Sequence, residues 1–480
     1  MMSTVSPHSQ NSLTSTRRTR IRAAHLVGIG GSGMQALAQM MHGFRCRITG
    51  SDRTISDRLF WQMHQQGLRV NRGHDAANIP ESADVLIYSP AVPEDNPERL
   101  EASRYGLPQL SLSQAIGRMM AGRTGVSVAG THGKTSTTAL LGHLLESAGL
   151  SPSVLAGAES RGRGVSGWAG RGALLVVESC EYREHFLDLT PKHAILLNIE
   201  PDHFDCFPTL ESSIETFGRF AAQLPDDGTL LVNANCSSAM QVALQSQARI
   251  VTFGSRVGAD WWLSDMRQTS RGWRFRLFHR SSFFGEFDLP LPGRQQVLNA
   301  VAAVAMSRHL GARRRHIAEG LRTFAGVARR FEQIGSWRGV TLIDDYAHHP
   351  TAIHLTLKTA RERFGRRRVW CAFQPHQISR TRALLPEFAR SLCVADQVLM
   401  APVFAAREIE SDDQRRLSSE MAERINRGGT PARYVESLDE IRATIETEAR
   451  PGDVFITLGA GDIDRIAHEF TQRLQRHRAS

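Results

Sequence analysis

Short, continuous apolar runs alternate with amphipathic stretches along the whole of this 480-residue chain. Runs without polar alternation are typical of strands buried on both faces of a parallel sheet, and amphipathic stretches are typical of the helices that cover it. The alternation therefore predicts an α/β fold. Strands are expected at residues 25–29, 83–88, 127–129, 173–178, 193–198, 341–345, 369–373, 397–401 and 454–458, and helices at 135–147, 295–309 and 381–395.

A glycine-rich loop in the middle of the chain carries one of its three lysines and leads from an expected strand into an expected helix. Its glycines let backbone N–H groups approach phosphate oxygens, and the helix N-terminus adds positive potential. The lysine can reach the β- and γ-phosphates of a nucleotide, and the next hydroxyl can ligate Mg²⁺. Val128 stands where a Walker loop has its first glycine, so an accidental turn is the alternative. The candidate nucleotide-binding residues are Gly130, Thr131, His132, Gly133, Lys134, Thr135 and Ser136.

Acidic residues follow the next two expected strands. Glu178 closes the first of them and Glu181 comes three residues later, while residues 200–203 (Glu-Pro-Asp-His) follow the second. Ligands of open α/β sheets bind at the C-terminal ends of strands, and a hard cation prefers carboxylate oxygens with an occasional imidazole. A single acid at a strand end is more often a cap or an ion-pair partner. The order of phosphate loop, glutamate and Glu-Pro-Asp-His nevertheless favours a magnesium site.

Another glycine-rich turn lies near the N-terminus. Residues 28–34 read Gly-Ile-Gly-Gly-Ser-Gly-Met between an expected strand and an expected helix, and Asp52 follows about twenty residues later. This spacing is the dinucleotide-binding fingerprint and, taken alone, predicts a nicotinamide-dependent oxidoreductase. A plain glycine-rich turn is the alternative.

The last third of the chain carries three further motifs. Residues 326–332 hold two adjacent arginines, and an arginine in such a turn can neutralise charge on phosphates. Residues 344–350 (Asp-Asp-Tyr-Ala-His-His-Pro) follow an expected strand. Two adjacent histidines could suggest a transition metal, but neighbouring side chains in a turn rarely point at the same ion. In residues 373–382, Arg380 can clamp a carboxylate with two hydrogen bonds.

Composition limits the partners of the chain. Its net charge of +10 suits anionic ligands such as nucleotides, but no long basic block, zinc-finger spacing or basic zipper follows the arginines of the first 22 residues, so no nucleic acid is expected. No apolar run reaches the roughly 18 residues of a membrane span, so no membrane segment is expected. The six cysteines lack a C-x-x-C pair and predict reduced cytoplasmic thiols.

Taken in order over roughly residues 22–475, these motifs resemble the muramyl ligase family. Gly-Ser-Asp at 50–52, Gly-His at 73–74 and Tyr-Ser-Pro-Ala-Val at 88–92 resemble that family's UDP-sugar domain rather than a dehydrogenase. The resemblance implies a cytoplasmic, ATP- and Mg²⁺-dependent ligase that joins L-alanine to UDP-N-acetylmuramate through an acyl phosphate in peptidoglycan precursor synthesis. It leaves a monomer or a homodimer open.

Strand restarts near residues 21, 125 and 337 place domain boundaries near 122 and 328. The polar first residues are expected to be a disordered tail at 1–21, and alternation near 255–287 predicts a small antiparallel extension of the middle domain. With the resemblance, these parts become a Rossmann-like UDP-sugar domain at 22–122, a central P-loop-type ATPase domain at 123–328 and a Rossmann-like ligase domain at 329–480. The resemblance implies that the catalytic residues are Lys134, Arg330 and His348. It implies that the metal ligands are Thr135, Glu178 and His203. The residues implied to bind adenine, ribose or phosphate beyond the phosphate loop are Gln296, Asn299, Asp345 and Arg330. The residues implied to bind the sugar substrate and the amino acid are Gly30, Gly31, Ser32, Gly33, Asp52, His74, Ser89 and Arg380.

The chain departs from the family's patterns at residues 179–180, 295–296 and 377–378. The first change leaves open whether Glu178 or Glu181 is the main metal ligand. The third lies beside the expected amino-acid site and leaves alanine, glycine, serine or a peptide open as the acceptor. A murein peptide recycling ligase and a catalytically retired regulatory homologue are therefore the alternatives.

Overall fold

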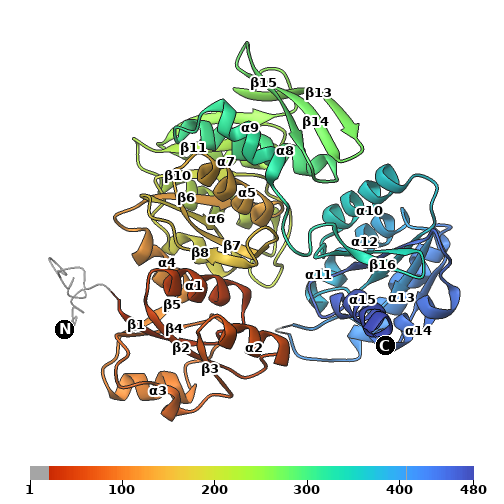
Figure 1. The fold of residues 1–480 in the computed structure, drawn as a ribbon, viewed down its shortest axis with the longest axis horizontal. Coiled ribbons are helices and arrows are strands. Elements are labelled where there is room, and N and C mark those ends of the chain that lie inside the picture. Colours follow the sequence, from red (N-terminus) through yellow and green to blue (C-terminus); the bar gives the residue numbers. More distant parts are fainter. Residues whose placement is uncertain (1–20, 407, 480) are drawn as a thin grey trace, which may run out of the picture.

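The computed structural model describes residues 21–406 and 408–479, so nearly all of the expected tail lies outside the described residues. Three consecutive α/β domains, each with its own sheet, make up this part of the chain, as the sequence predicted. Figure 1 shows the N-terminal domain below the central domain and the C-terminal domain beside them. Within the described residues, no helix combines the length and the apolar character that crossing a membrane requires.

The N-terminal domain is built on five parallel strands. Its elements are β1 (Ala23–Val27), α1 (Ser32–Gly43), β2 (Arg47–Asp52), α2 (Asp57–Gln65), β3 (Arg69–Arg72), η1 (Ala76–Asn78), β4 (Val85–Tyr88), α3 (Pro97–Arg104), β5 (Gln109–Ser111) and α4 (Leu112–Met120). The strand order β3-β2-β1-β4-β5 reverses direction between β1 and β4. Ligands of such sheets bind beside the C-terminal ends of the strands at this reversal, where the glycine turn follows β1.

The central domain holds a ten-stranded sheet in the order β15-β14-β13-β12-β11-β10-β6-β9-β7-β8. Its elements are β6 (Thr124–Ala129), α5 (Lys134–Ser147), β7 (Ser153–Ser160), β8 (Val165–Trp168), β9 (Leu174–Glu178), η2 (Tyr182–Asp188), β10 (His193–Leu196), α6 (Leu210–Ala222), β11 (Thr229–Asn233), α7 (Ser237–Ala243), β12 (Arg249–Gly254), β13 (Trp261–Thr269), β14 (Gly272–His279), β15 (Ser282–Leu289), α8 (Arg294–His309) and α9 (Arg314–Thr323). The central strands β10, β6 and β9 are parallel, so their C-terminal ends meet at one edge. The antiparallel extension expected near 255–287 is present as β13 to β15.

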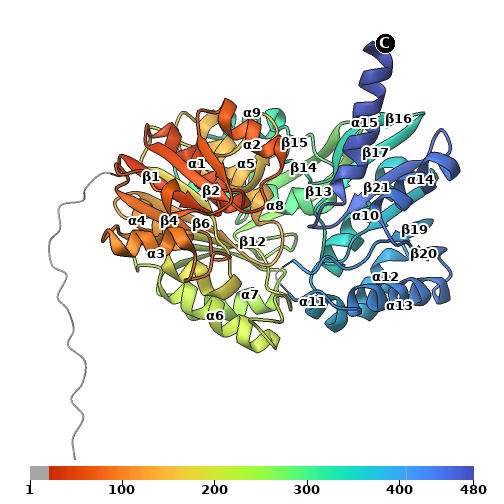
Figure 2. The same cartoon turned by 90° about the horizontal axis from the view of Figure 1, so that it is seen from below.

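The C-terminal domain has a six-stranded sheet in the order β16-β17-β21-β18-β19-β20, with only the edge strand β16 antiparallel. Its elements are β16 (Glu332–Trp337), β17 (Val340–Asp345), α10 (Pro350–Phe364), β18 (Val369–Phe373), α11 (Ile378–Ala383), α12 (Leu385–Leu392), β19 (Gln397–Met400), α13 (Asp413–Arg427), β20 (Ala432–Tyr434), α14 (Leu438–Glu448), β21 (Val454–Leu458) and α15 (Asp464–Ala479). Figure 2 shows this domain beside the other two, with α15 leading to the C-terminus.

Every strand expected from the apolar runs is present, with ends that differ by a few residues at most. The single helix expected at 381–395 is wrong. The chain instead forms α11 and α12, and Leu384 between them has φ −112° and ψ 20°. Pro386 follows directly in the first turn of α12, where its missing N–H costs nothing, whereas one continuous helix would have placed it in the interior.

A buried histidine, His193, gives the central domain a pH dependence. His193 begins β10 and packs edge-on against His309 at the end of α8, at 4.8 Å between ring centroids. Burial, followed by the charge of His309, lowers the pKa of His193 from 6.5 to about 4. Unfolding restores the ordinary pKa, so the unfolded chain binds more protons in this range and stability falls as the pH drops from 6.5 to about 4.

We expect His193→Asn to weaken this pH dependence. Between pH 6.5 and 4 the variant should take up fewer protons on unfolding, by at most about one, because it lacks the titrating ring. Melting temperatures measured across the range test this, with the exposed His354 replaced by asparagine as the matched control. Parallel curves for wild type and His193→Asn would contradict the assignment.

Candidate active site

Residues of all three domains line one cavity of about 440 Å³. The glycine turn of the N-terminal domain, the acidic strand ends of the central domain and four segments of the C-terminal domain, after β17, β18, β19 and β21, face it. The sequence-predicted residues among its lining are Gly31, Ser32, Gly33, Ser89, Glu178, His203, His348 and Arg380. Motifs that are up to 350 residues apart in the chain therefore meet in one place, at C-terminal ends of strands.

The phosphate loop joins β6 to α5 through two glycines with left-handed backbones, Gly130 at φ 134° and Gly133 at φ 83°. Lys134 folds back over this loop and donates to the carbonyl of Gly130 at 2.5 Å and to Glu181 at 2.9 Å. Burial would lower the pKa of Lys134, but the carboxylates of Glu181 and Glu178 raise it above its ordinary value. The loop therefore carries a fixed positive charge, as phosphate binding requires.

We expect Gly133→Ala to disturb nucleotide binding more than backbone strain alone explains. A Cβ at Gly133 would lie 2.7 Å from Oδ1 of Asn299, so the loop or α8 must shift. Gly149 has a similar φ of 77° with open space around it, so Gly149→Ala reports the left-handed strain alone, about 1–2 kcal/mol. Gly133→Ala should cost more and raise the KM for ATP at least about tenfold, because small misplacements of a binding loop are expensive. Chemical denaturation and steady-state kinetics test both variants, and equal losses with unchanged KM would contradict the loop's role.

The predicted metal ligands lie beside the phosphate loop. The Thr135 hydroxyl donates to Oε1 of Glu178 at 2.9 Å, and Nε2 of His203 lies 3.6 Å from Oε1 of Glu181. Oε2 of Glu181 and Nδ1 of His203 are buried and have no hydrogen-bond partner among the described residues. A buried carboxylate oxygen and a buried imidazole nitrogen without hydrogen-bond partners are suitable ligand atoms for a divalent cation such as Mg²⁺. Both glutamates border this position, so either remains a candidate ligand.

An arginine turn brings the C-terminal domain to the same point. Nη2 of Arg330 donates to the Thr135 hydroxyl at 3.1 Å. Asp345 accepts hydrogen bonds from the backbone N–H groups of Phe331 and Ala347, both at 2.8 Å. Burial raises the pKa of this carboxyl, against the opposing charge of Arg330. In this structure Asp345 therefore holds the arginine turn in place, and its contact with a ribose stays a prediction.

His348 and Arg380 line the cavity from the C-terminal domain. Nδ1 of His348 donates to the carbonyl of Tyr346 at 2.9 Å, and burial holds the pKa of this ring well below 6.5. Arg380 is only 1% exposed, and its Nε donates to Asp202 of the central domain at 2.7 Å while Nη1 donates to the carbonyl of His376. A bidentate contact with an amino-acid carboxylate would therefore require one of these atoms to exchange partners.

The N-terminal residues divide into two groups. Gly31, Ser32, Gly33 and Ser89 line the cavity. The N–H of Gly30 instead donates to Asp52 at 2.8 Å, and His74 bonds through Nδ1 to the hydroxyl of Ser51 at 2.9 Å. In the described part of the chain, Gly30, Asp52 and His74 thus brace the glycine turn from outside the cavity lining.

A second cavity, of about 320 Å³, borders Arg330. Arg161, Arg271 and Arg363 line it, so it has a strongly basic wall. A narrow pocket that also borders Arg330 contains Ser136 and Gln296, and Nδ2 of Asn299 donates to Oε1 of Gln296 at 3.4 Å. The residues predicted to hold a nucleotide therefore lie together between the phosphate loop and the arginine turn.

Tyr182, His185 and His376 are among the cavity residues that sequence reasoning did not assign. The first two lie on η2, directly after Glu181, where Arg183 and Glu184 have φ of 49° and 60°. Nothing in the sequence indicated that this left-handed turn would face the N-terminal domain. His376 lies within the motif at residues 373–382, and only the presence of Arg380 nearby indicated that this segment would reach the site.

Comparisons with known proteins identify the family. Three family models match: the Mur ligase family catalytic domain at residues 23–124, the Mur ligase middle domain at 168–307 and the Mur ligase glutamate ligase domain at 329–461. The chain is 38% identical to the UDP-N-acetylmuramate–L-alanine ligase of Desulfitobacterium hafniense, over 92% of this chain and 98% of that protein. It is 37% identical to the enzyme of the same name from Salinibacter ruber, over 95% and 96%.

Solved structures of related ligases share the fold of this chain. The UDP-N-acetylmuramate–alanine ligase of Thermotoga maritima superimposes with a TM-score of 0.79 at 27% identity, covering 95% of this chain and 99% of that one. A murein peptide ligase from Psychrobacter arcticus shares the fold, with a TM-score of 0.73 at 23% identity over 94% and 98%. With three domain models in order and near-complete coverage of its relatives, this chain belongs to the Mur ligase family.

Proposed function

We propose that this protein is an ATP-dependent ligase that adds L-alanine to UDP-N-acetylmuramate in peptidoglycan precursor synthesis. The observation that carries the proposal is the cavity shared by three domains, which joins the glycine turn, the acidic strand ends and the loop of Arg380. We assign residues 22–122 to the UDP-sugar, 123–328 to ATP and 329–480 to the amino acid. The six cysteines are all free, which suits the proposed cytoplasmic location.

The reaction has two steps in this proposal. A carboxylate oxygen of the sugar acid attacks the γ-phosphorus of ATP, the bond to the bridging oxygen breaks, and ADP leaves. The amine of L-alanine then attacks the acyl carbon of the acyl phosphate, the carbon–oxygen bond breaks, and phosphate leaves. Closure of the domains around the cavity keeps water from the acyl phosphate.

Residues of two domains stabilise the phosphoryl group. Arg330 of the C-terminal domain donates to the Thr135 hydroxyl, and Lys134 of the central domain donates to the Gly130 carbonyl of the same loop, so both charges lie at the phosphate loop, where negative charge develops. Thr135, Glu178 and His203 would hold Mg²⁺, which supplies further charge neutralisation when bound. Because Arg330 comes from the last domain, the ATP site is complete only when that domain is docked.

We propose that His348 accepts the proton released by the attacking amine. Its Nδ1 donates to a backbone carbonyl, which leaves the lone pair of Nε2 free to act as a base. Burial lowers the pKa of the ring and keeps it neutral at pH 7. The low pKa makes it a weak base, so its contribution is to receive the proton within the closed cavity.

Phosphate release from purified protein tests the function. MgATP and UDP-N-acetylmuramate are combined in turn with L-alanine, glycine, L-serine and the murein tripeptide. The proposal predicts release that needs all three substrates and is fastest with L-alanine, with UDP-N-acetylmuramoyl-L-alanine as the product by mass spectrometry. Preference for the tripeptide would indicate a recycling ligase, and no release with any acceptor would indicate a retired regulatory protein.

A further inference from the structure

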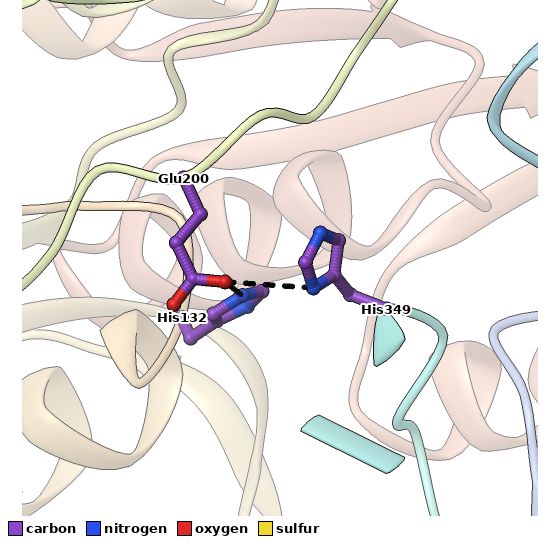
Figure 3. Close-up of side chains that lie close together, drawn as sticks. All are labelled: His132, Glu200 and His349. Atoms are coloured by element: carbon purple, nitrogen blue, oxygen red, sulfur yellow. Dashed lines mark hydrogen bonds and ion pairs between the residues drawn. The ribbon is translucent and has the colours of Figure 1, made fainter. Parts of the chain in front are cut away.

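Three potential metal-binding side chains meet at the boundary between the central and C-terminal domains. His132 belongs to the phosphate loop, Glu200 follows β10, and His349 precedes α10. Figure 3 shows both imidazoles directed toward the Glu200 carboxylate. Nε2 of His132 lies 3.4 Å and Nδ1 of His349 lies 3.8 Å from Oε2 of Glu200. The ligand atoms of all three residues lie within 4.8 Å of one another.

These separations suit a shared cation better than direct hydrogen bonds. Zn²⁺ bonds of about 2.0–2.1 Å in tetrahedral geometry place neighbouring ligand atoms roughly 3.3–3.5 Å apart. The His132–Glu200 distance of 3.4 Å already has this value, and the His349–Glu200 distance of 3.8 Å needs only a small adjustment. Both distances are long for a strong hydrogen bond between an imidazole and a carboxylate.

Neighbouring groups orient two of the three ligands. Nε2 of His349 donates to the carbonyl of Pro201 at 3.1 Å, so Nδ1 carries the lone pair. This Nδ1 accepts the backbone N–H of Thr351 at 3.4 Å and lies 3.8 Å from Oε2 of Glu200. The Thr351 hydroxyl donates to Oε2 of Glu200 at 2.6 Å. His349 is buried, while Glu200 and His132 are partly exposed, so an ion can reach the position from solvent. Oriented ligands with such outer partners are typical of built metal sites.

We propose that His132, Glu200 and His349 form a transition-metal site, with Zn²⁺ as the preferred ion, that ties the phosphate loop to the C-terminal domain. Two imidazoles and one carboxylate favour a borderline-soft ion over Mg²⁺, which prefers oxygen ligands alone. The site is separate from the Mg²⁺ position, which uses Thr135, Glu178 and His203. The adjacent histidines His348 and His349 do not bind the ion together. Only His349 takes part, because His348 lines the cavity.

Metal binding to the full-length protein tests the proposal. Protein stripped with a chelator is titrated with Zn²⁺ against a chromophoric indicator, in excess Mg²⁺ so that the magnesium position is filled. We expect one equivalent of Zn²⁺ in the wild type, and Co²⁺ in its place should give the visible absorption of a four-coordinate ion. Zn²⁺ should also raise the melting temperature, because a ligand of the folded state stabilises it.

Variants identify the site. His349→Gln keeps a polar side chain at the start of α10, and Glu200→Gln keeps the shape of the carboxylate. Each should weaken Zn²⁺ binding at least about tenfold and abolish the melting-temperature shift. His354→Gln, an exposed histidine of the same helix, should behave as wild type. Equal Zn²⁺ binding by wild type and both site variants, or no stoichiometric binding at all, would overturn the proposal.

Discussion

Lys134→Ala is expected to lower the rate of ATP-dependent phosphate release by about a thousandfold or more. Lys134 is the cation of the phosphate loop, and the neighbouring carboxylates keep it protonated. Removing one preorganised charge from a phosphoryl-transfer site costs several kcal/mol of transition-state stabilisation. Steady-state kinetics measure the loss, and it should fall on kcat more than on the KM for UDP-N-acetylmuramate, for which we propose a site in the N-terminal domain.

A second effect of this substitution must be separated from catalysis. Glu181, whose side chain is 4% exposed, loses its partner at 2.9 Å and becomes a buried unpaired charge. The double variant Lys134→Ala/Glu181→Gln removes that charge and should recover stability without recovering activity. Lys192→Ala is the matched control, since Lys192 pairs with Asp227 at the surface and should be silent. Activity of Lys134→Ala within tenfold of wild type would contradict the assignment of the loop.

Arg380→Ala is expected to weaken the docking of the C-terminal domain. Arg380 and Asp202 form a buried ion pair between domains, and removing one partner of such a pair typically costs about 3–5 kcal/mol. The charge of Arg380 opposes the effect of burial and holds the pKa of Asp202 well below its usual range. The variant should therefore unfold at lower denaturant, scatter X-rays as a more extended molecule, and show a higher KM for L-alanine.

The control for this variant lies on the same short helix. Arg382 pairs with Asp413 at the surface, so Arg382→Ala should change stability by less than about 1 kcal/mol. Arg380→Lys separates charge from shape, because lysine keeps the charge but cannot donate along two directions. Wild-type scattering and stability in Arg380→Ala would show that the ion pair does not hold the domains together.

The fold was predictable from sequence where local patterns decide it. Uninterrupted apolar strands such as residues 369–373 have few competing structures, and the phosphate loop has a strong glycine signature. The single helix expected at 381–395 was a wrong prediction, made because the amphipathic pattern continues across Leu384. The signal against it was Pro386, which a helix interior does not tolerate.

The site was predictable as a set of motifs but not as a set of contacts. Sequence order placed Glu178 and His203 after strands and Lys134 in the phosphate loop, and the sheet brings these segments together. Contacts between domains have no local signature, so the Arg380–Asp202 ion pair and the position of Glu200 beside His349 could not be foreseen. For the same reason, the sequence did not predict that Asp345 accepts the backbone N–H of Phe331 and so holds the arginine turn.

Isotope transfer tests the central claim most directly. UDP-N-acetylmuramate with ¹⁸O in its carboxylate is incubated with the protein, MgATP and L-alanine, and the released phosphate is analysed by mass spectrometry. If an acyl phosphate forms in the cavity of the three domains, one labelled oxygen passes from the carboxylate to each phosphate, in amounts equal to the new amide. Phosphate that carries no label would contradict the account.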